Sequence, residues 1–207
     1  MEVVTSATVH QPFIGTISKW GQVVVCLGLV AALSITPLMA AETRRDGGQK
    51  AGSSASAREA DLLRMESGIL DQTNKERLSR GLTLLRPSPA LTFLARRHSS
   101  HMCTSNTLAH ESDAFPAGWR SFAQRMGIVG VSFAGENVAF HSLLRTSDAW
   151  AKSVTRGWME SPRHRKNMLN PAFRYVGIGI VLCKDSIAWV TQVLAADAGR
   201  LAGNTVR

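Results

Sequence analysis

The sequence has few acidic residues, few aromatic residues and few cysteines, and it has no long apolar run. Its 207 residues include 15 aspartates and glutamates against 24 lysines and arginines, so the formal net charge is +9. Hydrophobic residues make up 44% and charged residues 19%, which excludes a disordered chain and a fibrous protein. The length predicts one domain with tails. The cationic excess fits an anionic partner surface but does not identify one.

The longest apolar stretch lies near the N-terminus and is too short for a comfortable membrane span. It covers residues 23–35, after a segment whose only lysine or arginine is Lys19, and small residues follow at Ala40 and Ala41. A basic flank, an apolar core of about 7–15 residues and small exit residues are typical of a secretory signal. The sequence therefore predicts a signal peptide at 1–41 and a secreted or periplasmic protein. If the signal is not cleaved, the same segment is a membrane anchor.

Cysteine is scarce, and one of the three cysteines, Cys26, lies in the predicted signal. The two that remain, Cys103 and Cys183, predict one disulfide bond, because paired cysteines are usual in exported proteins. Closing a loop of roughly 80 residues stabilises a fold by about 4 kcal/mol in the chain-entropy model. The alternative is a pair of buried free thiols.

Large apolar residues are absent from residues 42–60, where glycine, serine, alanine and charged residues dominate. This composition predicts a flexible linker. One folded domain is expected at 61–196, followed by a disordered tail at 197–207. No internal repeat interrupts the domain.

The hydrophobic period changes along the domain. Period 3.6 with capping residues predicts helices over 61–80, from Ser88, over 121–127, from Ser147 and from Ser161. Period two predicts a β-hairpin formed by residues 176–182 and 189–193. Helices followed by strands indicate an α+β fold with an antiparallel sheet.

Three polar residues are candidate metal ligands: His110, Glu136 and His164. Two imidazoles and one carboxylate, with water in the fourth position, suit zinc. His164 lies in the first turn of a predicted helix, where the helix dipole favours the neutral imidazole that binds metal. Their spacing matches no short ligand motif, so three ordinary polar residues remain the alternative.

Other chemistries have less support in the sequence. No G-x-S-x-G segment is present, and Ser161, although close to His164, is expected to cap a helix. His98 and His101 could share a ligand, but His98 lies on the apolar stripe of its predicted helix. No nucleic-acid-binding motif is found, so no nucleic-acid partner is expected.

Several segments follow one another in an order that is typical of one family. They are, in chain order, Asn74-Lys75-Glu76-Arg77 with Gly81-Leu82, the loop around His110, Gly135-Glu136-Asn137-Val138-Ala139, the stretch from Trp158-Met159-Glu160-Ser161-Pro162 through His164 to Leu169, Val176-Gly177-Ile178-Gly179 and Val190-Thr191-Gln192. The series resembles the CAP superfamily of cysteine-rich secretory, antigen 5 and pathogenesis-related proteins over about residues 66–195. It is most similar to the secreted bacterial, SCP-like branch.

The resemblance implies an α-β-α sandwich, with a central antiparallel sheet between helical layers and a cleft lined by histidine and glutamate. His110 and Glu136 match cleft positions. Plant and animal members carry an acid where Ser161 stands and a histidine where Trp189 stands, so only half of their four-residue site is kept. His164 matches a histidine of the bacterial branch.

Together, the residues and the resemblance favour a secreted or periplasmic monomer that acts as a non-enzymatic binding module. The expected ligand is a divalent metal such as Zn²⁺, a small lipid or sterol-like molecule, or an anionic envelope component. One alternative is a metal-assisted hydrolase that acts on envelope material, with Glu136 as the base. The other is a structural module with a vestigial cleft.

Overall fold

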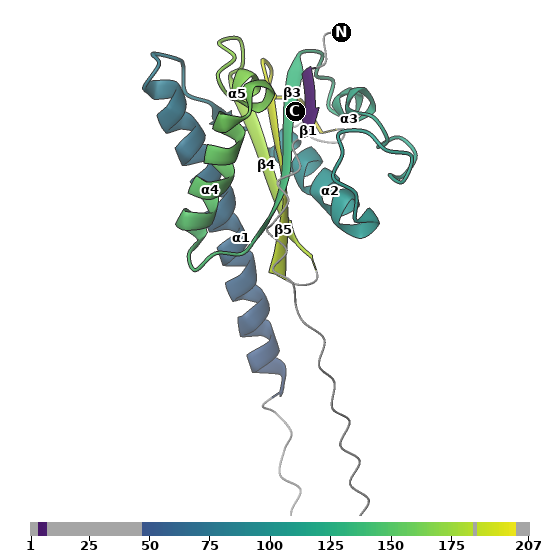
Figure 1. Ribbon diagram of the computed structural model, residues 1–207. Helices are drawn as coiled ribbons and strands as arrows, with labels where there is room; N and C mark the ends of the chain where they lie inside the picture. The colour runs from purple at the N-terminus through teal and green to yellow at the C-terminus, as the bar shows by residue number, and fades with distance from the viewer. Residues whose placement is uncertain (1–3, 8–46, 184–185, 202–207) are drawn as a thin grey trace, which may run out of the picture.

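The computed structural model describes residues 4–7, 47–183 and 186–201, arranged as two helical layers with a sheet between them (Figure 1). Apart from residues 4–7, the predicted signal peptide lies outside the described residues. The helices are α1 (Gly47–Leu78), α2 (Pro89–Ser105), α3 (Phe122–Ile128), α4 (Ser147–Glu160) and α5 (Pro162–Met168). The strands are β1 (Val4–Ala7), β2 (Arg86–Pro87), β3 (Ala134–Ser142), β4 (Tyr175–Leu182) and β5 (Ile187–Ala195).

The sheet has the strand order β1-β3-β5-β4-β2. Its three long central strands are antiparallel, with Glu136 of β3 opposite Val193 of β5, and Val193 opposite Gly177 of β4. The short outer strands β1 and β2 each pair with their neighbour in parallel. The predicted α-β-α sandwich and the β4–β5 hairpin are therefore confirmed, whereas the sheet as a whole is mixed.

Strand β3 has no counterpart among the predicted elements. The polar residues Glu136 and Asn137 lie in its middle, so the sequence shows no apolar alternation there. Both side chains are fully buried, one on each face of the sheet, and tertiary hydrogen bonds make that burial possible.

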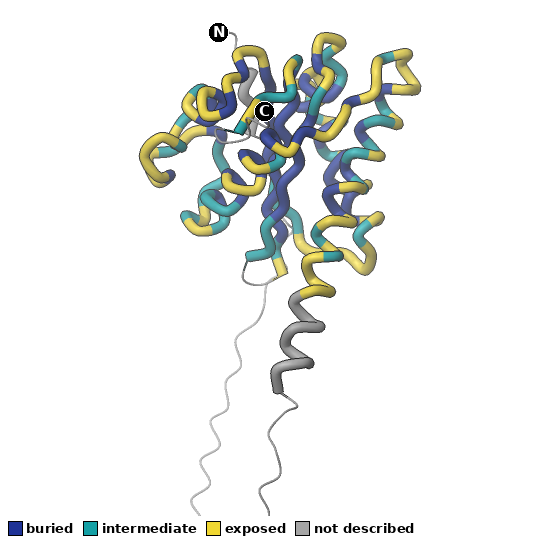
Figure 2. Tube along the Cα trace, turned by 180° about the vertical axis from the view of Figure 1, so that it is seen from behind, coloured by how far each residue is buried: buried dark blue, intermediate teal, exposed yellow. Residues whose placement is uncertain are grey.

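Helices α1, α4 and α5 cover one face of the sheet, and α2 and α3 cover the other (Figure 1). The first face packs mainly through Ile69 of α1 and Trp150 and Trp158 of α4. The second packs through Leu91 and Leu94 of α2 and apolar residues of α3. Figure 2 shows the strands as the most deeply buried part of the chain, as expected for a sheet covered on both sides.

Capping residues set the helix starts. The Ser88 hydroxyl accepts from the backbone N–H of Leu91 at 3.2 Å, and Ser121 forms a complete capping box with Gln124. The α4 cap differs from the prediction by one residue. Thr146, not Ser147, has the extended backbone of an N-cap, and its hydroxyl accepts from the N–H of Ala149 at 3.1 Å.

Helix α1 begins at Gly47 and thus runs through most of the predicted linker. That segment contains no proline, and its alanines favour helix. Residues 56–59 are exposed, as their lack of large apolar side chains suggested.

Residues 198–200, which fall in the predicted tail, contact the domain. The Arg200 N–H donates to the carbonyl of Val129 at 2.9 Å, and the Ser88 hydroxyl donates to the carbonyl of Ala198. These backbone contacts, which the composition does not reveal, hold residues 198–200 against the domain. Residues 202–207 lie outside the described part of the chain.

A disulfide joins Cys103, near the end of α2, to Cys183, just after β4. The two Cα atoms are 5.9 Å apart, and the cysteines are separated by 80 residues in sequence. The predicted disulfide is confirmed, and it fastens a helix of one layer to the sheet. Among the described residues, no helix is long and apolar enough to cross a membrane.

Candidate functional site

Strand β3 presents its two conspicuous polar residues to opposite faces of the sheet. Successive side chains of a strand alternate between faces, so Glu136 points towards α2 and α3, and Asn137 points towards α5. Contacts agree with this alternation: Glu136 meets Arg125 of α3, and Asn137 donates to the carbonyl of His164 in α5 at 3.3 Å.

The carboxylate of Glu136 is the centre of a buried polar cluster, which comprises His98, His110, Arg125 and Glu136. The Nη2 of Arg125 donates to both carboxylate oxygens, at 2.7 and 2.9 Å. The Nδ1 of His110 donates to Oε1 at 2.9 Å, and the Nε2 of His98 lies 3.6 Å from the same oxygen. All four side chains are buried.

Backbone contacts hold the members of this cluster in place. Arg125 also donates to the carbonyls of His110 and Trp119, at 2.9 and 3.1 Å. The Nε2 of His98 lies 3.1 Å from the carbonyl of Ala109, and because a carbonyl only accepts, this nitrogen carries the proton. The loop that bears His110 is thereby tied to both α2 and α3.

Charge inside the cluster shifts two pKa values. Burial by itself raises the pKa of Glu136, but Arg125, His98 and His110 together outweigh it and bring the pKa to about 2. Burial lowers the pKa of His98 to about 4. At neutral pH the cluster therefore contains an ionised carboxylate, a guanidinium and a neutral His98.

This arrangement makes Glu136 a structural anion rather than a catalytic base. A general base works best when its pKa is near the operating pH, whereas the pKa of Glu136 lies far below neutrality. Both carboxylate oxygens already accept from Arg125. The geometry therefore gives no support to a hydrolase in which Glu136 activates water.

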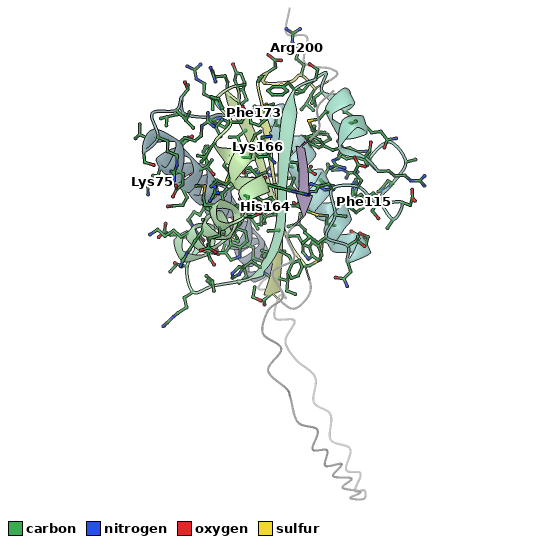
Figure 3. All side chains as sticks on the ribbon, turned by 45° about the horizontal axis from the view of Figure 1, so that its top comes forward. Lys75, Phe115, His164, Lys166, Phe173 and Arg200 are labelled. Atoms are coloured by element: carbon green, nitrogen blue, oxygen red, sulfur yellow. A yellow bond between two sulfur atoms is a disulfide. The ribbon has the colours of Figure 1, made fainter. Side chains whose placement is uncertain are left out.

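His164, the third predicted ligand, lies on the other side of β3. Figure 3 shows it on α5, away from Phe115, whose ring packs edge-on against His98 with centroids 5.2 Å apart. The structure thus brings His110 and Glu136 together but not the predicted set of three. Across the described ranges, no group of three or more His, Cys, Asp or Glu side chains is placed to hold a metal ion. Zinc binding stays a prediction.

Amide side chains connect β3, which carries Glu136, to α5, which carries His164. Asn167 donates to the side-chain oxygen of Asn137 at 2.9 Å and to the carbonyl of Glu136 at 3.1 Å. Asn137 in turn donates to Gln192 at 3.0 Å. These hydrogen bonds fasten α5 to β3 and β5.

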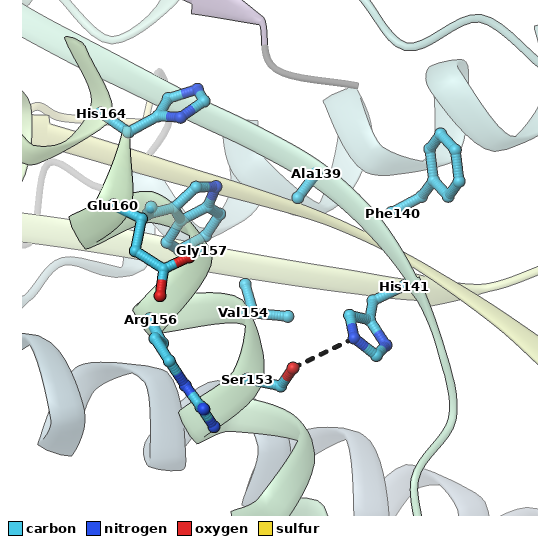
Figure 4. Close-up of a pocket in the computed structure, with 10 residues that line it drawn as sticks. Ala139, Phe140, His141, Ser153, Val154, Arg156, Gly157, Glu160 and His164 are labelled. Carbon is cyan, nitrogen blue, oxygen red and sulfur yellow. Dashed lines mark hydrogen bonds between the residues drawn. The ribbon is translucent and has the colours of Figure 1, made fainter. Parts of the chain in front are cut away.

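A cavity of about 260 Å³ opens between β3 and α4, on the His164 side of the sheet (Figure 4). Its lining combines apolar and polar groups. The lining residues are Ala139, Phe140, His141, Ser153, Val154, Arg156, Gly157, Trp158, Glu160 and His164. The cluster of His98, His110, Arg125 and Glu136 contributes no lining residue to it.

Comparison with known proteins gives the family. The model of the cysteine-rich secretory protein family, CAP, matches residues 70–194. The chain belongs to this family. The Bacillus subtilis protein YkwD is 31% identical over 131 residues, which cover 62% of this chain and 46% of YkwD. The B. subtilis membrane protein YlbC is 31% identical over 117 residues, covering 56% of this chain and 31% of YlbC.

A solved structure agrees with this assignment. An extracellular SCP-domain protein from Bacillus anthracis superimposes with a TM-score of 0.51 at 31% identity, over 64% of this chain and 40% of that one. The present chain thus spans less than half the length of these relatives. Their similarity supports the bacterial branch of the CAP family.

Two members of the buried cluster, His98 and Arg125, were not among the predicted site residues. His98 lies on the apolar stripe of α2. This position indicated that the side chain faces the sheet, but it did not indicate that the side chain contacts Glu136. Arg125 gave a weaker signal, as a basic residue three positions after Phe122 on a capped helix. Trp189, where plant and animal members of the family carry histidine, is a core residue that packs against Phe140 with ring centroids 5.2 Å apart.

The cluster predicts a loss of stability in acid that occurs in two stages. Both His98 and Glu136 bind protons less readily in the folded chain than in the unfolded one. Their stabilisation is therefore complete above pH 6.5. As the pH falls, the His98 contribution decreases between 6.5 and about 4, and the Glu136 contribution between 4.5 and about 2. Urea unfolding should show a decrease of about 3 kcal/mol in the first stage.

The variant His98→Gln keeps a donor near Ala109 but does not titrate. It should lose the His98 part of the first stage and keep the second. His101, whose pKa burial also lowers, still contributes to the first stage. An unfolding free energy that stays constant from pH 7 to pH 4.5 in the parent would contradict the assignment of His98 as a buried neutral imidazole.

Proposed function

We propose that this CAP-domain protein is an exported binding module whose cavity between β3 and α4 holds a small amphipathic ligand. The observation that carries the proposal is the lining of that cavity. Ala139, Val154 and Trp158 provide apolar surface, and His141 and Ser153 provide hydrogen-bonding groups. Apolar and polar residues contribute equally to the lining, so it offers an amphipathic ligand both apolar contact and hydrogen bonds.

The size of the cavity limits the ligand. At about 260 Å³, it lies slightly below the usual range of about 300–1,000 Å³ for ligand pockets. A short acyl chain or one end of a larger envelope lipid fits better than a complete sterol. We therefore propose an acyl group as the bound part.

Export is supported by three independent features. The confirmed disulfide between Cys103 and Cys183 is of the kind that persists in oxidising compartments. The segment at 1–41 has the pattern of a secretory signal, and the similar B. anthracis protein is extracellular. Localisation outside the cytoplasm is part of the proposal.

Gly157 provides the test, because it lies in α4 on the cavity wall and a Cβ added there would meet nothing within 4 Å. Leucine at this position should occupy ligand space without disturbing the core. Calorimetric titration of the full chain with octanoate should show binding that is at least about tenfold weaker in Gly157→Leu, a change of about 1.4 kcal/mol.

The matched control is Gly127→Leu in α3, where an added Cβ also meets nothing within 4 Å and which does not line the cavity. This variant should bind octanoate as the parent does. Equal binding by Gly157→Leu and the parent, or no binding of octanoate by the parent, would refute the proposed ligand site.

A further inference from the structure

We infer that Ser153 and His141 form a nucleophile–base pair that hydrolyses small, uncharged carboxylic esters in this cavity. The inference rests on the proposed function, because it requires the cavity to accept an acyl group, and it adds a reaction to binding. It depends on hydrogen bonds that are separate from the cluster around Glu136.

His141, in β3, is fixed in the orientation that a base needs. Its Nδ1 lies 2.6 Å from the carbonyl oxygen of Ser142, and because a carbonyl only accepts, Nδ1 carries the proton. The neutral ring then has its free electron pair on Nε2, which lies 3.1 Å from the hydroxyl oxygen of Ser153. The hydroxyl therefore donates to the imidazole, as a nucleophile does to its base.

Neighbouring groups support this histidine. The indole of Trp150 packs edge-on to its ring, with centroids 6.4 Å apart, and donates to the carbonyl of His141 at 3.4 Å. Trp150 is itself buried in the core. The base is thus held by a carbonyl on one side and by a rigid aromatic side chain on another.

Space for a substrate lies next to the nucleophile. Ser153 is in α4, and Gly157 follows it by one turn on the same face. Since a Cβ at Gly157 would meet nothing within 4 Å, the missing side chain leaves room beside the Ser153 hydroxyl. Figure 4 shows the Ser153–His141 hydrogen bond at the wall of the cavity, with Val154 beside it.

Charged groups of both signs line the cavity. Arg156 and Glu160 are both lining residues and both are exposed, so the wall does not favour one sign of ligand charge. The acyl chain, which octanoate shares with an uncharged ester, is the part that the cavity selects. Arg156, three residues after Ser153 in α4, has no ion-pair partner among the described residues. His164 is the other titratable group at the cavity.

The reaction needs only the ester and water. The Ser153 oxygen attacks the carbonyl carbon while its proton passes to Nε2 of His141. The ester C–O bond then breaks, and the alcohol leaves with that proton. Water attacks the acyl-serine and gives one proton to His141, which returns it to the Ser153 oxygen as the acid departs. The net change is ester plus water to acid plus alcohol.

The test is hydrolysis of p-nitrophenyl butyrate by the full chain. We expect turnover that falls by about 100-fold or more in Ser153→Ala and in His141→Gln, with a double variant no worse than either single variant, because the two residues act as a unit. Ser100→Ala, the same change on a helix of the opposite layer, should retain full turnover. A fluorophosphonate should form a covalent adduct on Ser153 that Gly157→Leu prevents.

Octanoate binding separates the possible failures. Titration of the parent with octanoate tests whether the cavity binds an acyl group, independently of the reaction. Parent protein that binds octanoate but neither hydrolyses the ester nor forms the adduct would overturn the nucleophile–base pair and leave the binding function standing. Hydrolysis that persists in Ser153→Ala would also overturn it. Loss of both binding and hydrolysis in the parent would overturn both proposals.

Discussion

Replacing Arg125 by methionine is expected to destabilise the fold by about 3–5 kcal/mol, because it leaves a buried carboxylate without its counter-ion. Glu136 is fully buried, and both of its oxygens accept from the Nη2 of Arg125. The same guanidinium satisfies the carbonyls of His110 and Trp119, which would also lose a donor. Urea unfolding at pH 7 measures the loss.

The partner of Arg125 provides the control for this prediction. In Arg125→Met/Glu136→Gln the buried charge is absent, so the double variant should be more stable than Arg125→Met alone. Arg125→Lys should fall between the parent and Arg125→Met, because an ammonium cannot donate in the forked geometry of a guanidinium. A cost below about 1 kcal/mol for Arg125→Met would place the pair in a solvated rather than a buried setting.

Replacing Gly179 by alanine is expected to cost about 3 kcal/mol or more, at or above the upper end of the range for overpacked cores. Gly179 lies in β4 under α2, and an added Cβ would overlap the backbone of Ala95 and Arg96. A flexible side chain could move aside, but helix backbone cannot. The helix would have to lift from the sheet and break the 2.8 Å hydrogen bond from Ser99 to the carbonyl of Gly179.

Alanine substitutions at Gly177 and Gly157 provide a similar case and a contrasting case. Gly177 also faces α2, and a Cβ there would overlap the backbone of Leu91, so Gly177→Ala should be similarly destabilising. Gly157→Ala, in the open part of α4, should instead stabilise by about 0.5–1 kcal/mol, since alanine is the better helix former. Thermal or urea unfolding of the three variants measures the contrast. Equal stability of Gly179→Ala and the parent would show that α2 does not pack this closely on β4.

The glycines of the Val176-Gly177-Ile178-Gly179 segment and the polar residues of the Gly135-Glu136-Asn137 segment thus serve the architecture. The first segment lets a helix lie directly on a strand. The second supplies one polar side chain to each layer, where Arg125 binds Glu136 and Asn167 binds Asn137. In this chain, these two segments therefore serve mainly to join the layers of the sandwich.

Local patterns in the sequence determined most elements of this fold. Ser88 and Ser121 start helices because a short hydroxyl side chain satisfies free N–H groups within its own turn. The β4–β5 hairpin follows from period two over adjacent residues. The disulfide could be predicted because one of only three cysteines lies in the predicted signal, which leaves one pair. The α-β-α sandwich was predicted from the resemblance of the ordered segments to the CAP family.

Only the tertiary structure decided which polar side chains meet. Glu136 and Asn137 are adjacent in sequence, yet the pleat of β3 sends one to His98, His110 and Arg125 and the other towards His164. Because Glu136 and His164 lie on opposite faces of the sheet, the predicted ligand set of His110, Glu136 and His164 does not form. His141 and Ser153 meet because β3 and α4 pack side by side. Such contacts depend on the register and packing of whole elements, which hydrophobic period and capping within one element do not specify.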